Sequence, residues 1–283
     1  PGETQEDFEH LKQFVKDVVK FWMQEYRIDG FRFDLSKGFT QKNTGNDMTL
    51  WSQFDQSRIN IWKDYNSYIK SIDNNNFYVI LEHFAEASEE KVLAEEGMML
   101  WNNLNYNFNE ATMGWLPTSN FKGAFYQEHG FSTMDGLVTY MESHDEERIM
   151  YKNLSYGNTG VKGNLVNSLL RTEAAAAFLF AIPGPKMIWQ FGELGYDVSI
   201  DYNGRVGEKP LHWEYNTNSD RLRLKNAFTK FMNLKKNNNV FQATNVLYSL
   251  GGGVKYIRLI NGSQTVVVIG NFDITNQNVG VPF

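Results

Sequence analysis

Acidic residues at the ends of three predicted strands are the side chains best suited to do chemistry. Asp34 closes the run "IDGFRFD", Glu82 follows "FYVIL", and Asp145 ends "GLVTYMESHD". Residues two apart in a strand share a face, so Arg32 should meet Asp34 and favour its ionised form. Glu82 follows a dense apolar run that suits a strand buried on both faces. Desolvation there would raise the pKa of Glu82, as a general acid requires.

Each of these acids also has a plainer structural explanation. A charge pair at a strand end, such as Arg32 with Asp34, is structural more often than catalytic. The alternative for Glu82 is a buried acid satisfied by a nearby basic side chain, and for Asp145 it is a solvated acidic loop. Four neighbouring acids are assigned surface or structural roles: Asp29, Glu142, Glu146 and Glu147.

The elements that must position these acids alternate between helix and strand. Apolar periodicity predicts helices over residues 4–26, 50–72, 88–96, 164–181 and 219–236. Strands are predicted over residues 28–34, 77–84, 98–101, 136–145 and 186–192. This alternation indicates parallel βαβ units with right-handed crossovers. In parallel α/β barrels reactive side chains lie where strands end, so the three acids are expected to converge there.

The pattern changes after "KKNNN". Short strands follow around Gly251 to Gly253, in "KYIRLI" and in "TVVVIGNF". We therefore predict a barrel-like domain over residues 1–238 and the start of a small all-β domain over residues 239–283.

Composition narrows the class of protein. Of the 283 residues, 42% are hydrophobic and 21% are charged, which is typical of a folded globular chain. The net charge of −6 argues against nucleic acid or an anionic membrane as a partner. The longest apolar run, residues 174–182, is far shorter than the roughly 20 residues of a membrane helix, so no membrane-spanning segment is expected. The absence of cysteine excludes disulfides and thiolate chemistry.

The residue types at the three strand ends indicate a reaction class. One ionised carboxylate, one protonated carboxyl group and an orienting arginine are what retaining glycoside hydrolysis uses, with the two carboxyls about 5–5.5 Å apart. A barrel enzyme with unrelated metal chemistry is the alternative, and it would need clustered ligands. The five histidines are instead scattered along the chain: His10, His83, His129, His144 and His212.

Four motifs resemble the α-amylase family of glycoside hydrolases (family 13), in particular bacterial members of the Bacteroides type. "GFRFDLSK" resembles the family's fourth-strand motif and "VILEH" its fifth-strand motif. "ESHDEER" is similar to the seventh-strand Asn-His-Asp motif, and "IPGPKMIWQFGELG" to the eighth-strand region. Their order and spacing match over nearly the whole chain.

The resemblance implies a role for each matching residue. Asp34 would be the nucleophile that forms a covalent glycosyl-enzyme, and Glu82 the general acid/base. Asp145 would hold sugar hydroxyls and stabilise the distorted ring. The other positions would bind or orient: Arg32 the nucleophile, His144 the sugar and Lys37 the leaving-group side. Two positions depart from the family pattern: Gly38 stands where histidine is usual, and Ser143 where asparagine is usual.

The resemblance also implies the fold, an α/β C-terminal part of a (β/α)8 TIM barrel, comprising strands four to eight, followed by the start of a small all-β domain. The family's third-strand motif is absent, and both chain ends look cut, so we expect a fragment. Five of eight strands cannot close a barrel. We therefore expect this polypeptide alone to be poorly stable or aggregation-prone, and inactive.

The implied activity is cleavage of α-1,4-glucosidic bonds in starch-like glucans, with an α-glucan or maltooligosaccharide as the partner. Two alternatives remain open: an α-glucan transglycosylase of the same family, and an inactive glucan-binding or structural relative. The presence of both Asp34 and Glu82 weighs against the second. The cofactor is undetermined, with calcium left open for a full-length protein. The compartment is also undetermined, although the resemblance favours secretion or the periplasm.

Overall fold

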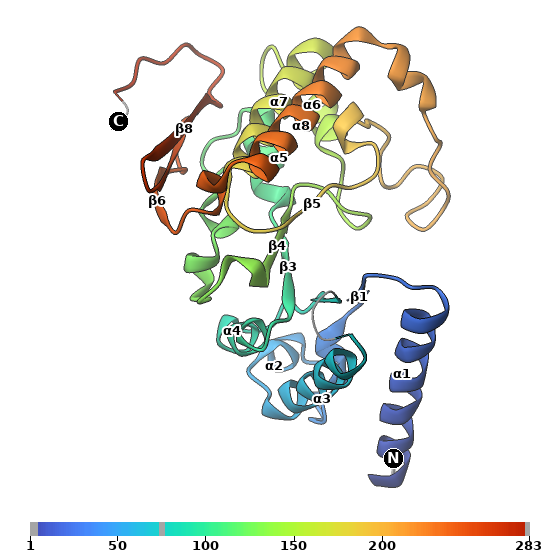
Figure 1. Cartoon of the computed structure of the whole chain (residues 1–283). Helices are drawn as coiled ribbons and strands as arrows, with labels where there is room; N and C mark the ends of the chain where they lie inside the picture. Colours follow the sequence, from blue (N-terminus) through green and yellow to red (C-terminus); the bar gives the residue numbers. More distant parts are fainter. Residues whose placement is uncertain (1–4, 74–76, 281–283) are drawn as a thin grey trace. The chain divides into compact units, whose positions relative to one another are not determined.

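The computed structural model describes residues 5–73 and 77–280, and its chain divides into two compact units. The first unit contains Pro1–Trp101 and His129–Leu137, and the second contains Asn102–Glu128 and Val138–Phe283. Figure 1 follows the chain from blue to red. The predicted helix start at residue 4 and the last residues of the predicted all-β domain, 281–283, lie outside the described residues.

The first unit begins with α1 (Gln5–Glu25), a long amphipathic helix that packs against α3. The elements that follow along the chain as far as Asn103 are β1 (Gly30–Phe33), the 3₁₀ turn η1 (Ser36–Phe39), α2 (Met48–Ser52), α3 (Gln56–Ile72), β2 (Tyr78–Leu81), α4 (Ala87–Glu95) and β3 (Met99–Asn103), whose end belongs to the second unit. Strand β1 pairs in parallel with β2, with Phe33 opposite Leu81. Because both strands end at this pair, Asp34 and Glu82 are the next residue on each.

Several predicted bounds in the first unit are wrong. The helix predicted over residues 50–72 is two helices, because Asp55 caps α3 by accepting a hydrogen bond from the Ser57 amide. Ser88 does not begin α4; its hydroxyl donates to Glu86 Oε1, and Glu86 holds the cap position. Strand β2 is not buried on both faces, since Tyr78 is 56% exposed.

The second unit contains the helices α5 (Asn105–Met113), α6 (Ile149–Tyr156), α7 (Leu165–Ala181) and α8 (Ser219–Asn237), and the strands β4 (Leu137–Tyr140) and β5 (Lys186–Met187). Helix α7 packs against α5 and α8 (Figure 1). Helices α5 and α6 were not predicted. Both strands are shorter than predicted, so residues 141–145 and 188–191 form loops beyond them.

The fold class predicted from the sequence is confirmed. Within the described residues, five short strands follow the order β1-β2-β3-β4-β5, and the pairs β1–β2, β2–β3 and β4–β5 are parallel. Helices separate these strands along the chain, as in the C-terminal part of a (β/α)8 barrel. An antiparallel sheet of β6 (Asn245–Ser249), β7 (Val254–Asn261) and β8 (Gln264–Asn271) follows.

The antiparallel sheet packs into the core of the second unit. Ile257 and Leu259 of β7 are fully buried, and the Phe272 ring lies 5.4 Å from the Phe178 ring of α7. The tight turn between β7 and β8 uses Gly262 at a φ of +59°, a conformation that glycine adopts without strain. The domain boundary at residue 238 stays a prediction.

Candidate active site

One guanidinium group contacts both carboxyl groups at the ends of β1 and β2. Arg32 Nη1 donates to Asp34 Oδ1 at 2.6 Å, and Arg32 Nη2 lies 3.1 Å from Glu82 Oε1. The Asp34 side chain is 75% exposed, whereas the Glu82 side chain is 13% exposed. The Arg32 guanidinium also lies over the Trp101 ring, 5.3 Å from its centroid, in a cation–π contact.

The backbone after Asp34 adds a further hydrogen bond to Glu82. Leu35 adopts a left-handed conformation (φ 44°, ψ 44°), and its amide donates to Glu82 Oε2 at 2.8 Å. The Glu82 amide donates to the Phe33 carbonyl at 3.0 Å, and the Ser36 amide donates to the Glu82 carbonyl at 2.9 Å. A non-glycine residue at positive φ costs about 1–3 kcal/mol. The left-handed conformation of Leu35 accompanies the hydrogen bond from its amide to Glu82.

The environment of Glu82 raises the pKa of its carboxyl group. Burial is the largest cause, and the neighbouring Asp34 raises the pKa further through its charge and a hydrogen bond. The Leu35 amide and the Arg32 charge act in the opposite direction without reversing the shift. A raised pKa favours the protonated form of Glu82, which is the form that a proton donor needs.

Lys37 lies on η1 in the same unit. Its Nζ donates to Ser52 Oγ and to the Phe84 carbonyl oxygen, each at 3.2 Å, and lies 5.2 Å from the centre of the Trp51 ring. Lys37 therefore joins η1 to α2 and to the segment that follows Glu82.

Glu86, the nearest sequence alternative to Glu82, is held in a structural role. Its carboxylate accepts hydrogen bonds from the Phe54 amide at 3.2 Å and from the Ser88 hydroxyl at 2.8 Å. These contacts tie the segment between α2 and α3 to the start of α4.

Asp145 and His144 lie in the second unit, on the loop beyond β4. His144 Nε2 is 3.2 Å from Asp145 Oδ2, and the His144 ring lies 5.6 Å from the ring of Trp189. The Arg205 guanidinium donates to the Asp145 carbonyl oxygen. These four residues help to line a cavity of about 330 Å³ within the second unit.

The strand predicted through Asp145 ends at Tyr140, so Ser143 and Asp145 do not share a strand face. Ser143 instead turns the loop, because its hydroxyl accepts a hydrogen bond from the Asp145 amide at 3.0 Å. The placement of the Asp145 side chain therefore depends on loop geometry.

The three glutamates around this loop do not form a solvated acidic surface. Glu142 is buried; it accepts a hydrogen bond from the Ile149 amide at 2.8 Å, and burial raises its pKa. The Glu147 carboxylate accepts from the Ser199 hydroxyl and the Ile200 amide. Burial also raises the pKa of Glu146. Each of the three carboxyl groups thus accepts hydrogen bonds from other residues of the second unit.

Sequence reasoning missed Trp189 and Arg205. Trp189 lies in the residues predicted as the last barrel strand, and an aromatic side chain at a strand end was an available signal. Arg205 comes from residues 195–212, a segment with no helix or strand, and nothing in its sequence pattern indicated a contact with Asp145.

The structure brings Arg32, Asp34 and Glu82 into direct contact and places Lys37 on the adjoining 3₁₀ turn. It also brings His144 and Asp145 together in the second unit. That His144 and Asp145 lie close to Asp34 and Glu82 stays a prediction.

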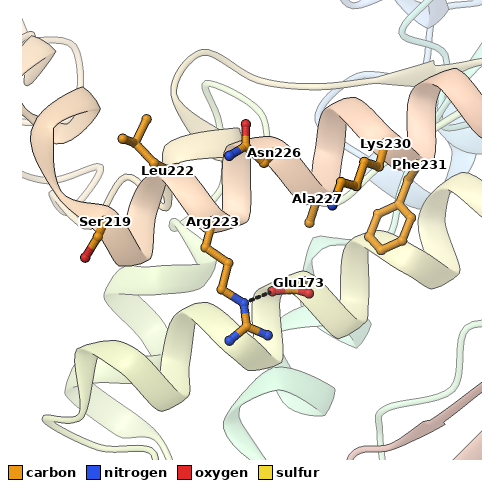
Figure 2. A pocket seen from close by; sticks show the side chains of 8 residues that line it. All are labelled: Glu173, Ser219, Leu222, Arg223, Asn226, Ala227, Lys230 and Phe231. Atoms are coloured by element: carbon orange, nitrogen blue, oxygen red, sulfur yellow. Dashed lines mark hydrogen bonds and ion pairs between the residues drawn. The ribbon is translucent and has the colours of Figure 1, made fainter.

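A different pocket lies between α7 and α8 and involves none of the predicted site residues. It has a volume of about 530 Å³, and the ion pair between Arg223 and Glu173 (Nε to Oε2, 3.0 Å) crosses it (Figure 2). The rest of its lining comes from α8 alone: Ser219, Leu222, Asn226, Ala227, Lys230 and Phe231.

Two further observations concern metals and membranes. Residues 5–73 and 77–280 contain no group of three or more histidine or acidic side chains placed to hold a metal ion. Within the same ranges no helix combines the length and the apolar composition that crossing a bilayer requires.

Residues 4–244 match the family model described as "Alpha amylase, catalytic domain". The chain belongs to this family.

Two curated proteins and one solved structure illustrate the relationship. The chain is 21% identical over 197 residues to the 1,4-alpha-glucan branching enzyme GlgB of Picrophilus torridus, an alignment that covers 65% of this chain and 26% of the enzyme. It is 24% identical over 198 residues to Alpha-amylase 3 of Dictyoglomus thermophilum, an alignment that covers 67% of this chain and 34% of that protein. The crystal structure of an Anoxybacillus alpha-amylase superposes with a TM-score of 0.65 at 18% identity, covering 96% and 54%. The chain thus spans about a quarter to a third of the curated relatives and about half of the solved structure.

Proposed function

We propose that the protein is a retaining glycoside hydrolase that cleaves α-1,4-glucosidic bonds in starch-like glucans. The observation that carries this proposal is the pair of carboxyl groups on Arg32, one exposed at Asp34 and one largely buried at Glu82 with a raised pKa. Membership of the alpha-amylase family supports the glucan as substrate.

In the first half of the proposed reaction, an Asp34 oxygen attacks the anomeric carbon of the glucose unit. The bond from that carbon to the glycosidic oxygen breaks, and Glu82 gives its proton to the departing oxygen. The product is a covalent glycosyl-enzyme on Asp34 and a shortened glucan. The Arg32 guanidinium, 2.6 Å from Asp34, would stabilise the negative charge of the attacking carboxylate.

In the second half, the ionised Glu82 removes a proton from water as the water oxygen attacks the same carbon. The bond to Asp34 breaks, and both carboxyl groups return to their starting protonation states. Asp145 and His144 are proposed to hold sugar hydroxyls, and Lys37 to contact the leaving-group side.

The covalent step provides the test. We expect a 2-deoxy-2-fluoro or 5-fluoro glucosyl fluoride to label the full-length protein at Asp34, as detected by peptide mass spectrometry. Labelling of Glu82, or of Glu86, would contradict the assignment of roles. Absence of any label together with inverted product stereochemistry by NMR would exclude the retaining mechanism.

Transfer to a second sugar is the other candidate activity, and the branching-enzyme relative favours considering it. Transglycosylation uses the same glycosyl-enzyme but replaces water with a sugar hydroxyl. Incubation with a maltooligosaccharide of defined length separates the two activities. Only shorter products indicate hydrolysis, whereas products longer than the substrate indicate transfer.

A further inference from the structure

A buried chain of hydrogen bonds starts at the residues next to Asp34 and Glu82. Ser36 comes two residues after Asp34, and His83 directly follows Glu82. Ser36 Oγ lies 2.8 Å from His83 Nδ1, and His83 Nε2 lies 2.7 Å from Glu89 Oε1. Ser36, His83 and Glu89 are all 0% exposed, so the chain lies inside the core of the first unit.

Arg58 anchors the far end of this chain. Its Nε and Nη2 donate to the two oxygens of Glu89 at 2.6 and 2.7 Å, and the Asp55 amide donates to Glu89 Oε2 at 2.8 Å. Burial alone would raise the pKa of Glu89, but hydrogen bonds from His83 and Arg58 hold it below its ordinary value. Glu89 is therefore an ionised acceptor in a fixed orientation.

The ionised Glu89 determines which nitrogen of His83 carries the proton. A carboxylate can only accept, so His83 Nε2 must donate to it. Burial lowers the pKa of His83, and the charges of Arg58 and Lys37 also disfavour the imidazolium, while Glu89 acts in the opposite direction. His83 is thus neutral, and its Nδ1 accepts from the Ser36 hydroxyl.

Ser36 joins this chain to Glu82. Its hydroxyl lies 2.9 Å from the Glu82 carbonyl oxygen, so its one hydrogen is shared between that oxygen and His83 Nδ1. The Ser36 amide donates to the same carbonyl at 2.9 Å. Displacement of Ser36 or His83 would therefore move the backbone from which Glu82 projects, and the Leu35 amide that contacts its carboxyl group.

A serine, a histidine and a carboxylate in a row are also the groups of nucleophilic hydrolases. That role is excluded for Ser36, because its hydroxyl is fully buried and out of reach of any substrate. We propose instead that Ser36, His83 and Glu89 form a positioning relay that holds the Glu82 carboxyl group in place relative to Asp34. The proposal rests on the proposed function, since it assigns a purpose to the position of Glu82.

The first test needs no variant and no activity. In 15N NMR spectra of the protein, we expect His83 to titrate below the ordinary pKa of a histidine, and to be neutral at pH 7 to 8 with its proton on Nε2. A His83 ring that titrates near its ordinary pKa of about 6.5, or that carries its proton on Nδ1, would overturn the relay.

The second test removes only the Ser36 hydroxyl and compares the effect with that of removing another buried serine hydroxyl, at Ser168. Ser168 is likewise fully buried, and its hydroxyl donates to the Val161 carbonyl in the second unit. We expect Ser36→Ala to lower kcat about tenfold with KM nearly unchanged, because the proton donor is misplaced, and to shift the alkaline limb of the pH profile. Ser168→Ala should lower the melting temperature to a similar extent and leave both kinetic features unchanged. Equal kinetics in the two variants would reduce Ser36 to a structural role.

The third measurement separates failure of the relay from failure of the proposed function. The pKa of the Glu82 carboxyl group can be followed by 13C NMR in the wild type and in Ser36→Ala, whether or not the protein cleaves glucan. A change of at least about 0.5 in the pKa of Glu82 in the variant supports the relay, and an unchanged pKa contradicts it. A wild type that neither cleaves nor transfers glucan contradicts only the proposed function.

Discussion

Arg32 Nη2 lies 3.1 Å from Glu82 Oε1, and Arg32 Nη1 donates a hydrogen bond to Asp34 Oδ1. Arg32 and Asp34 come from one strand end, and Glu82 comes from the strand paired with it. Both carboxyl groups therefore share one positive charge, although only one of them is largely buried. This difference in burial, with the same basic partner, is what separates a nucleophile from a proton donor in the proposed reaction.

The proposed roles predict which acids matter for turnover. We expect Glu82→Gln to lower kcat by about 10²- to 10⁴-fold through loss of the proton donor, and Asp34→Asn to lower it at least as much. Asp29→Asn and Glu86→Gln are the matched controls and should retain activity. The measurement is the initial rate of reducing-end release from a maltooligosaccharide by the full-length protein. An inactive Glu86→Gln variant beside an active Glu82→Gln variant would invalidate the assignment.

The neighbours of Glu82 predict opposite shifts in its pKa. Because Asp34 raises this pKa, Asp34→Asn should lower it; because Arg32 lowers it, Arg32→Met should raise it further. Titration of the Glu82 carboxyl group by 13C NMR measures both. The raised pKa also affects folding: its contribution to stability is present at low pH and is lost as the pH rises from the ordinary value near 4.5 through the folded-state pKa.

The pair between Arg58 and Glu89 predicts a large loss of stability when one partner is removed. Arg58→Met leaves the Glu89 carboxylate buried without its bidentate partner, at a cost of about 3–5 kcal/mol. The control is Arg223→Ala, which breaks the ion pair with Glu173 in Figure 2, where the arginine side chain is 59% exposed. This pair should contribute less than about 1 kcal/mol. Urea unfolding followed by circular dichroism compares the two, and a similar midpoint for both variants would refute the prediction.

Lys255 predicts a second stability effect in the antiparallel sheet. Its Nζ is buried and donates to Ser119 Oγ and to the carbonyl oxygens of Leu250 and Gly252 at 2.7–3.0 Å. Lys255→Met leaves these acceptors unpaired and should cost about 1–3 kcal/mol. Lys236→Met, at an exposed position of α8, should change stability by less than about 0.5 kcal/mol. The melting temperatures of the two variants give the comparison. An unchanged melting temperature for Lys255→Met would show that these hydrogen bonds do not stabilise the fold.

The left-handed backbone at Leu35 predicts that glycine is tolerated at this position. Leu35→Gly keeps the amide that contacts Glu82 and removes the steric strain, while the lost side chain is only about half buried. We expect its stability to match or exceed that of the wild type by up to about 1 kcal/mol. Leu35→Val, with a branched β-carbon, should be less stable than the wild type. Thermal unfolding decides between this order and its reverse.

The sequence by itself determined the alternation of helices and parallel strands, and it identified Asp34 and Glu82 at two strand ends. It could do so because hydrophobic periodicity and strand propensity act locally, and each acid follows an apolar run. The same local signals overextended the strands around Asp145 and Trp189, because neither the apolar residues after β5 nor the polar residues after β4 mark where each strand ends. They also missed α5 and α6.

Only the tertiary structure decided the contacts between residues far apart in the chain. The sequence of η1 does not reveal that Leu35 is left-handed or that its amide meets Glu82, 47 residues later. Likewise, His83, Glu89 and Arg58 look like an ordinary histidine and ordinary surface charges until folding removes them from water. Burial makes their hydrogen bonds obligatory, because an unpaired buried charge is too costly to keep. For that reason the site's chemistry was visible in residue types, whereas its positioning was visible only in three dimensions.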